Sequence, residues 1–411
     1  TTNMADKKIR ENHLTAALAT DFKVSKEDVQ NVEWTESAGA GVMDGFTTEV
    51  VAARGTAKIA NKNHVNFSYI AKLTPEVGHR VDLVKDVSKV NILISFLKRL
   101  NFDFQMGIME KEYLFYVEIL GQANELRSKM KLKSLAIPKC LYGLPDPGVL
   151  IMNNLKDLGY DLIKNQTGSK MRGLQDEDLT LFLQALASFH ASTFQIIQES
   201  GGQDAFLQKY PTLANNLPLN KEFETMFKKE FNNSCENFAL TARDFIDDKT
   251  SEKILKFKKK IWSCFEKGFH QPYGDFQTII HGDSWVNNAM FRFEGDKAVE
   301  IAMLDFQCVR MTSPAVDLVY LIVTGTRPDL RTNFEKDWLK IYYEQFSQDL
   351  EAFGHSADEV YPFEKLVEDY DGIYDYGFTF CLMHIGVCKS FYFLLIFKKM
   401  LIEKSISGSD G

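Results

Sequence analysis

Two acidic residues and one amide occur in an order that suits phosphoryl transfer. Asp283 follows a His-Gly turn after an apolar run, Asn288 follows it in the order Asp-x-x-x-x-Asn, and Asp305 ends the next apolar run. Phosphoryl transfer needs an acceptor hydroxyl oriented in line and a divalent cation that neutralises phosphate charge. Carboxylate and amide oxygens are ligands that Mg²⁺ prefers. We therefore predict that Asp283 orients the acceptor, while Asn288 and Asp305 bind magnesium.

The same order of Asp and Asn occurs in the catalytic loop of protein kinases, with Gly282 where those enzymes carry Arg. His281 could carry a proton, but one donor and one acceptor suit a neutral imidazole that braces the loop. His190 lies in the apolar run ALASFHA and is expected in the core. Asp317 follows a Ser-Pro turn and is expected to tether the loop.

Residues of the kind that bind a nucleotide precede this segment. Lys72 ends the apolar run FSYIAKL, and Glu112 follows in a helical pattern. An ion pair between them would direct the ammonium group at the α- and β-phosphates. A lone lysine at a strand end is more often a surface residue, so the order of all the motifs carries this assignment. Gly39, Gly41 and Gly45 form a GxGxxxG loop that could approach phosphates, with an ordinary turn as the competing interpretation.

The elements expected around these residues change in character along the chain. Residues 1–35 have a helical pattern, whereas residues 46–73 alternate and are rich in β-branched side chains, which predicts an antiparallel sheet. A helix is expected over 107–128 and a strand over 149–152.

After residue 153 the pattern is almost wholly helical, apart from two strand-like runs within 276–306. Strands followed by helices predict an α+β fold. We expect a nucleotide-binding N-terminal lobe over 1–153 and a helical C-terminal lobe over 154–411, which would carry the catalytic loop and the acceptor site.

The segments HGDSWVNN and MLDFQ closely resemble the HGDxWxxN and DFQ signature of the ecdysteroid kinase-like, or CHK kinase-like, family, which is related to choline kinases and aminoglycoside phosphotransferases. The segments SPAVDLVYLI, LASFHA and NNLKDLGY resemble other parts of that family, so the resemblance covers roughly residues 35–325. It implies a bilobed, protein-kinase-like fold, ATP and Mg²⁺ as cofactors, and an ecdysteroid or other lipophilic alcohol as acceptor.

The resemblance also implies that the adenine lies beside Met152, at the hinge between the lobes. Asn153 and Asn154 stand where the family commonly carries acidic residues. An adenine contacted through backbone atoms would be compatible with that difference.

Composition excludes several other classes of protein. The 411 residues are 45% hydrophobic and 25% charged with a net charge of -8, so a broad nucleic-acid surface has no electrostatic support. The six cysteines form no clustered ligand spacing, and the polar N-terminus lacks a secretion signal, so a cytoplasmic location is expected. The apolar run Phe378–Phe397 contains His384 and Lys389, which favours a buried helix over a membrane span. Walker A, GxSxG and HExxH motifs are absent.

We therefore expect a phosphotransferase whose acceptor is the alcohol group of a small molecule. The alternative is a catalytically silent kinase-like protein that binds a hydrophobic ligand or a protein partner. Aromatic residues of the C-terminal stretch could line an acceptor pocket or belong to the core; they are Tyr374, Tyr376, Phe378, Phe380, Phe391, Tyr392 and Phe393. The sequence does not indicate an oligomeric state.

Overall fold

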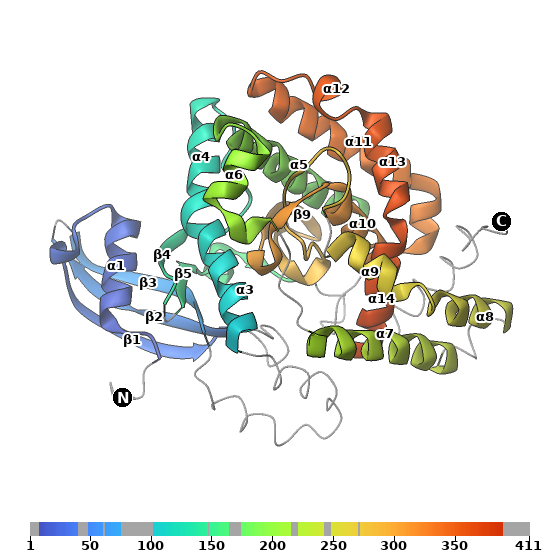
Figure 1. The fold of residues 1–411 in the computed structure, drawn as a ribbon. Helices are drawn as coiled ribbons and strands as arrows, with labels where there is room; N and C mark the ends of the chain where they lie inside the picture. The colour runs from blue at the N-terminus through green and yellow to red at the C-terminus, as the bar shows by residue number, and fades with distance from the viewer. Residues whose placement is uncertain are drawn as a thin grey trace. The chain divides into compact units, whose positions relative to one another are not determined.

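The chain forms two compact units, which are drawn in Figure 1. The first lies within residues 1–121 and 137–161, and the second within 122–136 and 162–411. The computed structural model describes residues 8–39, 48–60, 62–74, 102–146, 148–163, 174–214, 221–241, 248–269 and 272–388.

The first unit is built on an antiparallel sheet with the strand order β1-β2-β3-β5-β4. Its strands are β1 (Val29–Ala38), β2 (Glu49–Ile59), β3 (Lys62–Leu73), β4 (Cys140–Leu144) and β5 (Val149–Asn153). The strands β2, β3 and β5 confirm the sheet predicted over 46–73 and the strand predicted over 149–152.

The prediction of a helical pattern over residues 1–35 is wrong from residue 29 onward. The helix α1 (Glu11–Phe22) and a 3₁₀ turn at Lys26–Asp28 are helical, whereas the following residues form β1. The pairing of β1 with β2 shifts around Asn31, whose φ is 52°. Such a bulge interrupts the alternation of inward and outward side chains that would otherwise identify a strand.

The helix α1 lies across the sheet and packs on β1, β4 and β5 (Figure 1). Apolar side chains from α1 and from the strands form the core of this unit. The helix predicted over 107–128 is confirmed: α3 (Phe102–Leu114) continues through a π-helical turn at Phe115–Ile119 into α4 (Leu120–Lys129). A 3₁₀ turn at Leu155–Leu158 and the short strand β6 (Tyr160–Asp161) follow the sheet.

The second unit is mainly helical, as predicted, and the α+β fold class is confirmed. Its helices are α5 (Asp176–Glu199), α6 (Gln203–Lys209), α7 (Lys221–Thr241), α8 (Asp248–Phe257), α9 (Ile261–Phe269), α10 (Ala315–Gly325), α11 (Pro328–Ala352), α12 (Ala357–Val360), α13 (Phe363–Gly372) and α14 (Tyr374–Cys388), with a 3₁₀ turn at Pro211–Leu213. Every residue of α10 is buried, and this helix packs against α14. No helix of the described ranges has the length and apolar character needed to cross a bilayer.

Four short strands of the second unit carry the loops of the candidate site. The strands β7 (Thr278–Ile280) and β10 (Arg310–Thr312) pair antiparallel, as do β8 (Ala289–Glu294) and β9 (Lys297–Met303). The runs expected within 276–306 correspond to β7 and β9, while β8 was not predicted. Helix α5 packs against both β7 and β9.

Candidate active site

Asp283 lies at the centre of a hydrogen-bond network between β7 and the 3₁₀ turn Val286–Asn288. Its Oδ2 accepts a hydrogen bond from Nδ2 of Asn288 at 2.9 Å, and its main-chain oxygen accepts one from the same amide at 2.9 Å. The hydroxyl of Tyr320 donates to Oδ1 at 2.8 Å. Both carboxylate oxygens are therefore held in fixed directions.

Asp305 follows β9 and begins the 3₁₀ turn Phe306–Cys308. Its backbone has φ 66° and ψ 63°, a left-handed conformation that is strained for a residue with a Cβ and that often occurs at functional sites. Its Oδ2 accepts a hydrogen bond from Nε2 of Gln307 at 3.1 Å. Burial raises the pKa of Asp283, and the nearby charge of Asp305 raises it further. The fold thus brings the two carboxylates and Asn288 into one region.

His281 connects the loop of Asp283 to the segment that leads to Asp305. Its Nε2 donates to the main-chain oxygen of Leu304 at 2.7 Å, and its Nδ1 accepts the N–H of Asp283 at 3.2 Å. This pair of bonds requires a neutral imidazole with its proton on Nε2. The N–H of Leu304 also donates to the main-chain oxygen of Asn288 at 2.8 Å. The geometry favours the bracing role over that of a proton carrier.

Asp317, at the start of α10, holds the backbone of the same loop. Its Oδ2 accepts the N–H of His281 at 2.7 Å, and its Oδ1 accepts the N–H of Gly282 at 2.8 Å and the hydroxyl of Ser284 at 3.2 Å. The carboxylate is fully buried. Burial acts to raise its pKa, but the hydrogen bonds that it accepts from His190 and from the N–H of Gly282 outweigh this effect, so the pKa of Asp317 is lowered. Asp317 is therefore a buried anion that tethers the loop.

His190 is a core residue, as expected, and supports Asp317 from α5. Its Nε2 lies 3.1 Å from Oδ2 of Asp317, and its Nδ1 lies 2.9 Å from the hydroxyl oxygen of Tyr342. Burial lowers the pKa of His190, which keeps the ring neutral. The ring then donates to Asp317 and accepts the hydroxyl proton of Tyr342.

Gly282 occupies a position that only glycine fits. Its φ is 81°, in the region that residues with a Cβ rarely adopt. A Cβ added there would lie 2.2 Å from the main-chain oxygen of Cys308 and 2.5 Å from Nη1 of Arg310. The space that a side chain at this position would need is thus filled by Cys308, which ends the turn Phe306–Cys308, and by Arg310 of β10.

Lys72 and Glu112 form the predicted ion pair within the first unit. Nζ of Lys72, on β3, lies 2.5 Å from Oε1 of Glu112, on α3. The side chain of Glu112 is fully buried, while that of Lys72 is 12% exposed. The buried carboxylate holds the ammonium group, and in the sheet Lys72 pairs with Val50 of β2 and with Leu150 of β5.

Of the three glycines of the GxGxxxG segment, only Gly39 lies in the described residues. Its N–H donates to the main-chain oxygen of Val50 at 3.0 Å, which continues the pairing at the end of β1. Gly41 and Gly45 lie outside the described residues, so their role as a phosphate-binding loop stays a prediction.

Met152 lies on β5 between Ile70 of β3 and Cys140 of β4, and its side chain is buried. The amides that follow it have structural partners. Oδ1 of Asn153 accepts the N–H of Lys139 at 2.9 Å, and Nδ2 of Asn154 donates to the hydroxyl of Ser68 at 3.0 Å. These amides fasten the end of β5 to its surroundings.

Tyr320 was missed by the sequence reasoning, although it contacts Asp283 directly. A signal was present in the segment DLVY, where Tyr320 follows Asp317 at helical i, i+3 spacing. Residues at this spacing share one helix face, so a tyrosine there can reach the loop that the aspartate tethers.

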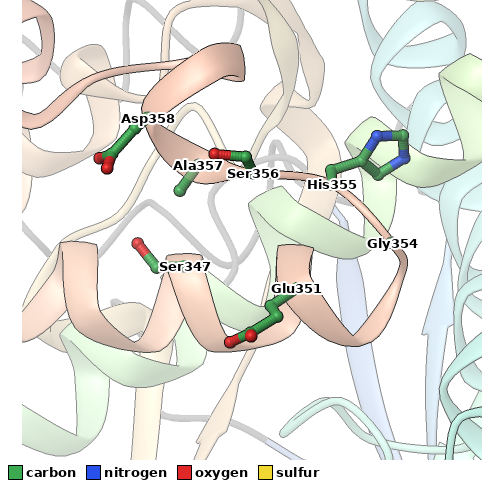
Figure 2. A pocket seen from close by; sticks show the side chains of 7 residues that line it. All are labelled: Ser347, Glu351, Gly354, His355, Ser356, Ala357 and Asp358. Carbon is green, nitrogen blue, oxygen red and sulfur yellow. The ribbon is translucent and has the colours of Figure 1, made fainter.

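The aromatic residues expected at an acceptor pocket are core residues as far as the structure describes them. Tyr376, Phe378 and Phe380 are buried, and Tyr374 is half-buried, whereas Phe391, Tyr392 and Phe393 lie outside the described residues. A surface hollow lies elsewhere, around the loop between α11 and α12 (Figure 2). It is lined by Ser347, Glu351, Gly354, His355, Ser356, Ala357 and Asp358, and it includes none of the residues that surround Asp283.

The oxygen atoms near Asp283 suit a magnesium ion that is shared with phosphates. Nδ2 of Asn288 makes both bonds to Asp283, so its Oδ1 is left for another partner. No group of three His, Cys, Asp or Glu side chains in the described ranges forms a cation site.

Comparison with known proteins identifies the family of the chain. The chain is similar in structure to Plasmodium vivax ethanolamine kinase, with 11% identity, a TM-score of 0.33, and coverage of 98% of this chain and 94% of that one. It is also similar to aminoglycoside 2'-phosphotransferase-IIIa in complex with GDP, with 13% identity, a TM-score of 0.32, and coverage of 93% and 100%. No curated protein matches it. The sequence model of the ecdysteroid kinase-like family matches residues 97–355, a range that contains Asp283, Asn288 and Asp305. The chain belongs to the ecdysteroid kinase-like family.

Proposed function

We propose that this protein is an ATP-dependent small-molecule kinase that transfers the γ-phosphate to an alcohol group. The observation that carries the proposal is the loop in which Asn288 holds Asp283 beside Asp305. Phosphoryl transfer depends mainly on positioning and on electrostatic stabilisation, and an acidic loop of this kind supplies both. Membership of a kinase-like family supports the same reaction class.

Each residue of the loop has a distinct role in this proposal. Asp283 accepts a hydrogen bond from the hydroxyl of the acceptor. This bond directs the hydroxyl oxygen of the acceptor at the γ-phosphate. Asn288 and Asp305 would hold Mg²⁺, which neutralises charge on the phosphate oxygens when it is bound. Asp317 and His281 keep the loop backbone in place, as their hydrogen bonds indicate.

Nucleotide binding is assigned to residues of the first unit. Lys72, held by Glu112, would bind the α- and β-phosphates of ATP. The backbone of β5 at Met152 would contact the adenine, since the side chains of Asn153 and Asn154 are occupied by structural hydrogen bonds.

We propose a lipophilic alcohol, such as an ecdysteroid, as the acceptor. The name of the family supports this choice. The proposal thus separates into phosphotransfer chemistry, which rests on the loop, and acceptor identity, which rests on the family.

The test combines transfer and binding. Purified protein is incubated with Mg²⁺, ATP that carries a labelled γ-phosphate, and a panel of steroid, sterol and amino alcohols that includes ecdysone. We expect label in one class of alcohol, loss of transfer in Asp283→Ala, and retained binding of ATP in that variant. Asp296→Ala is the matched control, because Asp296 is an exposed acid in the turn between β8 and β9. No transfer to any alcohol, with no stabilisation by Mg-ATP on heating, contradicts the proposal.

A further inference from the structure

Tyr320 is a buried tyrosine whose hydroxyl touches the carboxylate of Asp283. The hydroxyl donates to Oδ1 at 2.8 Å, and the residue is 1% exposed. Burial raises the pKa of Tyr320 well above its usual value, and the charge of Asp283 raises it further. The hydroxyl therefore keeps its proton and acts as a permanent donor to the carboxylate.

Two donors fix the carboxylate of Asp283 from opposite oxygens. Asn288 holds Oδ2 at 2.9 Å, and Tyr320 holds Oδ1. If only Asn288 were present, rotation about the terminal bond of the side chain would still move Oδ1, because that torsion is soft. The bond from Tyr320 removes this freedom. An ionised carboxylate oxygen has two lone pairs, so Oδ1 can accept a second hydrogen bond from a substrate hydroxyl.

One helix holds both the backbone and the side chain of the loop. Asp317, in the first turn of α10, accepts the N–H groups of His281 and Gly282, and Tyr320 lies one turn later. Residues at this spacing lie on one face of a helix. The position of α10 therefore sets both the path of the loop and the direction of the Asp283 carboxylate.

The ring of Tyr320 is fixed by aromatic residues of α14. Its centroid lies 4.5 Å from that of Phe380 and 6.4 Å from that of Tyr376. Tyr376 and Phe380 also contact each other in an edge-to-face arrangement at 4.9 Å. Packing of this kind restricts the ring, so the hydroxyl cannot leave Asp283 by a small rotation.

We propose that Tyr320 is a positioning residue for phosphoryl transfer, which holds the Asp283 carboxylate so that it can orient the acceptor hydroxyl. This inference rests on the proposed kinase function. Because Tyr320 acts on the acceptor side of the reaction, its loss lowers kcat and leaves the KM for Mg-ATP unchanged.

The experiment compares two variants that each lose one buried hydroxyl from the same aromatic group. Tyr320→Phe loses the bond to Asp283, whereas Tyr376→Phe removes a buried hydroxyl whose charged neighbour is Arg310 and not Asp283. Phosphate transfer from Mg-ATP is measured with an alcohol that the parent phosphorylates, together with the thermal midpoint. We expect Tyr320→Phe to lower kcat roughly tenfold to a hundredfold, as for a lost hydrogen bond to a charged group. The KM for Mg-ATP should stay within about twofold of the parent in both variants, and Tyr376→Phe should keep the parent kcat.

The outcomes separate this inference from the function on which it rests. A parent-like kcat in Tyr320→Phe, or equal losses in the two variants, overturns the positioning role while the kinase function stands. A parent that transfers no phosphate to any alcohol of the panel overturns both. If Tyr320→Phe does not fold, Phe380→Leu is measured instead, because it loosens the ring and keeps the hydroxyl. A lower kcat with an unchanged KM for Mg-ATP then supports the inference, and a parent-like kcat contradicts it.

Discussion

The amide of Asn288 donates to Asp283 twice, to the main-chain oxygen and to Oδ2, with both distances at 2.9 Å. One side chain therefore closes the turn and also orients the carboxylate of the residue that begins it. Because the amide nitrogen makes both bonds, the amide oxygen of Asn288 is the atom that can serve a cation. The two proposed roles of Asn288, as a brace for Asp283 and as a magnesium ligand, are carried by different atoms of one group.

Replacing Asn288 with Ala should impair both roles. We expect kcat to fall at least roughly tenfold, since a hydrogen bond to a charged group is lost, and the Mg²⁺ concentration for half-maximal rate to rise. Initial rates measured over a range of Mg²⁺ concentrations check this. Asn287→Ala, a change to the neighbouring half-buried amide, should leave both quantities near those of the parent. Equal changes of kcat and of the Mg²⁺ requirement in the two variants would contradict a specific role of Asn288. They would mean that any substitution in this turn disturbs the loop.

Replacing Gly282 with Ala should destabilise the protein through a steric overlap. The added Cβ would lie 2.2 Å from the main-chain oxygen of Cys308. Gly295→Ala is a matched control, because Gly295 also has a positive φ, 63°, but no atom lies within 4 Å of its Cβ position. We expect a loss of about 1–2 kcal/mol at Gly295 from the backbone alone. At Gly282 the loss should be about 2 kcal/mol larger, because overlap is added. Urea unfolding of the two variants checks this, and equal losses contradict it.

The arrangement of the candidate catalytic loop could be predicted because it is local. Asp283, Asn288 and Asp305 lie in a short stretch of sequence, and the turn and strands between them leave few arrangements. The bond from Tyr320 to Asp283 is different, because the two residues are 37 positions apart. Such a contact depends on how α10 packs against the 3₁₀ turn Val286–Asn288, which no local pattern specifies.

The error in the first strand has a local cause. Residues 29–38 carry the side chains of a strand, but the bulge at Asn31 breaks their alternation, so that a helical continuation of α1 could not be distinguished. Pairing with β2, which lies further along the chain, decides the conformation. The roles of Gly41 and Gly45 stay predictions for another reason, since those residues lie outside the described ranges.

Replacing Asp317 with Asn should cost about 1.5–3 kcal/mol of the free energy of unfolding, because buried donors lose the charged group that accepts their hydrogen bonds. The carboxylate accepts bonds from two backbone N–H groups, from Ser284 and from His190, and is fully buried. The NH₂ group of an asparagine would face some of these donors, and it cannot accept a hydrogen bond from them. Asp296→Asn, at an exposed turn, should stay within about 0.5 kcal/mol of the parent. Urea unfolding at neutral pH measures both variants, and a loss of similar size at the two positions would contradict a specific role of Asp317.

Stability should fall with acid through His190. Burial lowers the pKa of His190 from its usual 6.5, so the unfolded chain binds a proton at this residue at a higher pH than the folded chain does. The neutral His190 therefore makes its full contribution to the free energy of unfolding above pH 6.5. That contribution is lost as the pH falls below 6.5, because the unfolded chain then binds a proton that the folded chain does not. Each such proton changes the free energy of unfolding by about 1.4 kcal/mol per pH unit.

His190→Asn separates this effect from the other groups that titrate in acid. The parent is expected to lose stability more steeply than the variant between about pH 6.5 and 5, because only the parent has a buried imidazole that must be protonated on unfolding. The lowered pKa of Asp317 acts in the same direction, but below the usual carboxyl value of 3.8, and so outside this window. Urea unfolding at several pH values gives the two slopes. Parallel slopes would contradict the prediction, because they would mean that His190 has the same pKa in the folded and unfolded states. The burial of His190 against Asp317 and Tyr342 is the reason to expect different slopes.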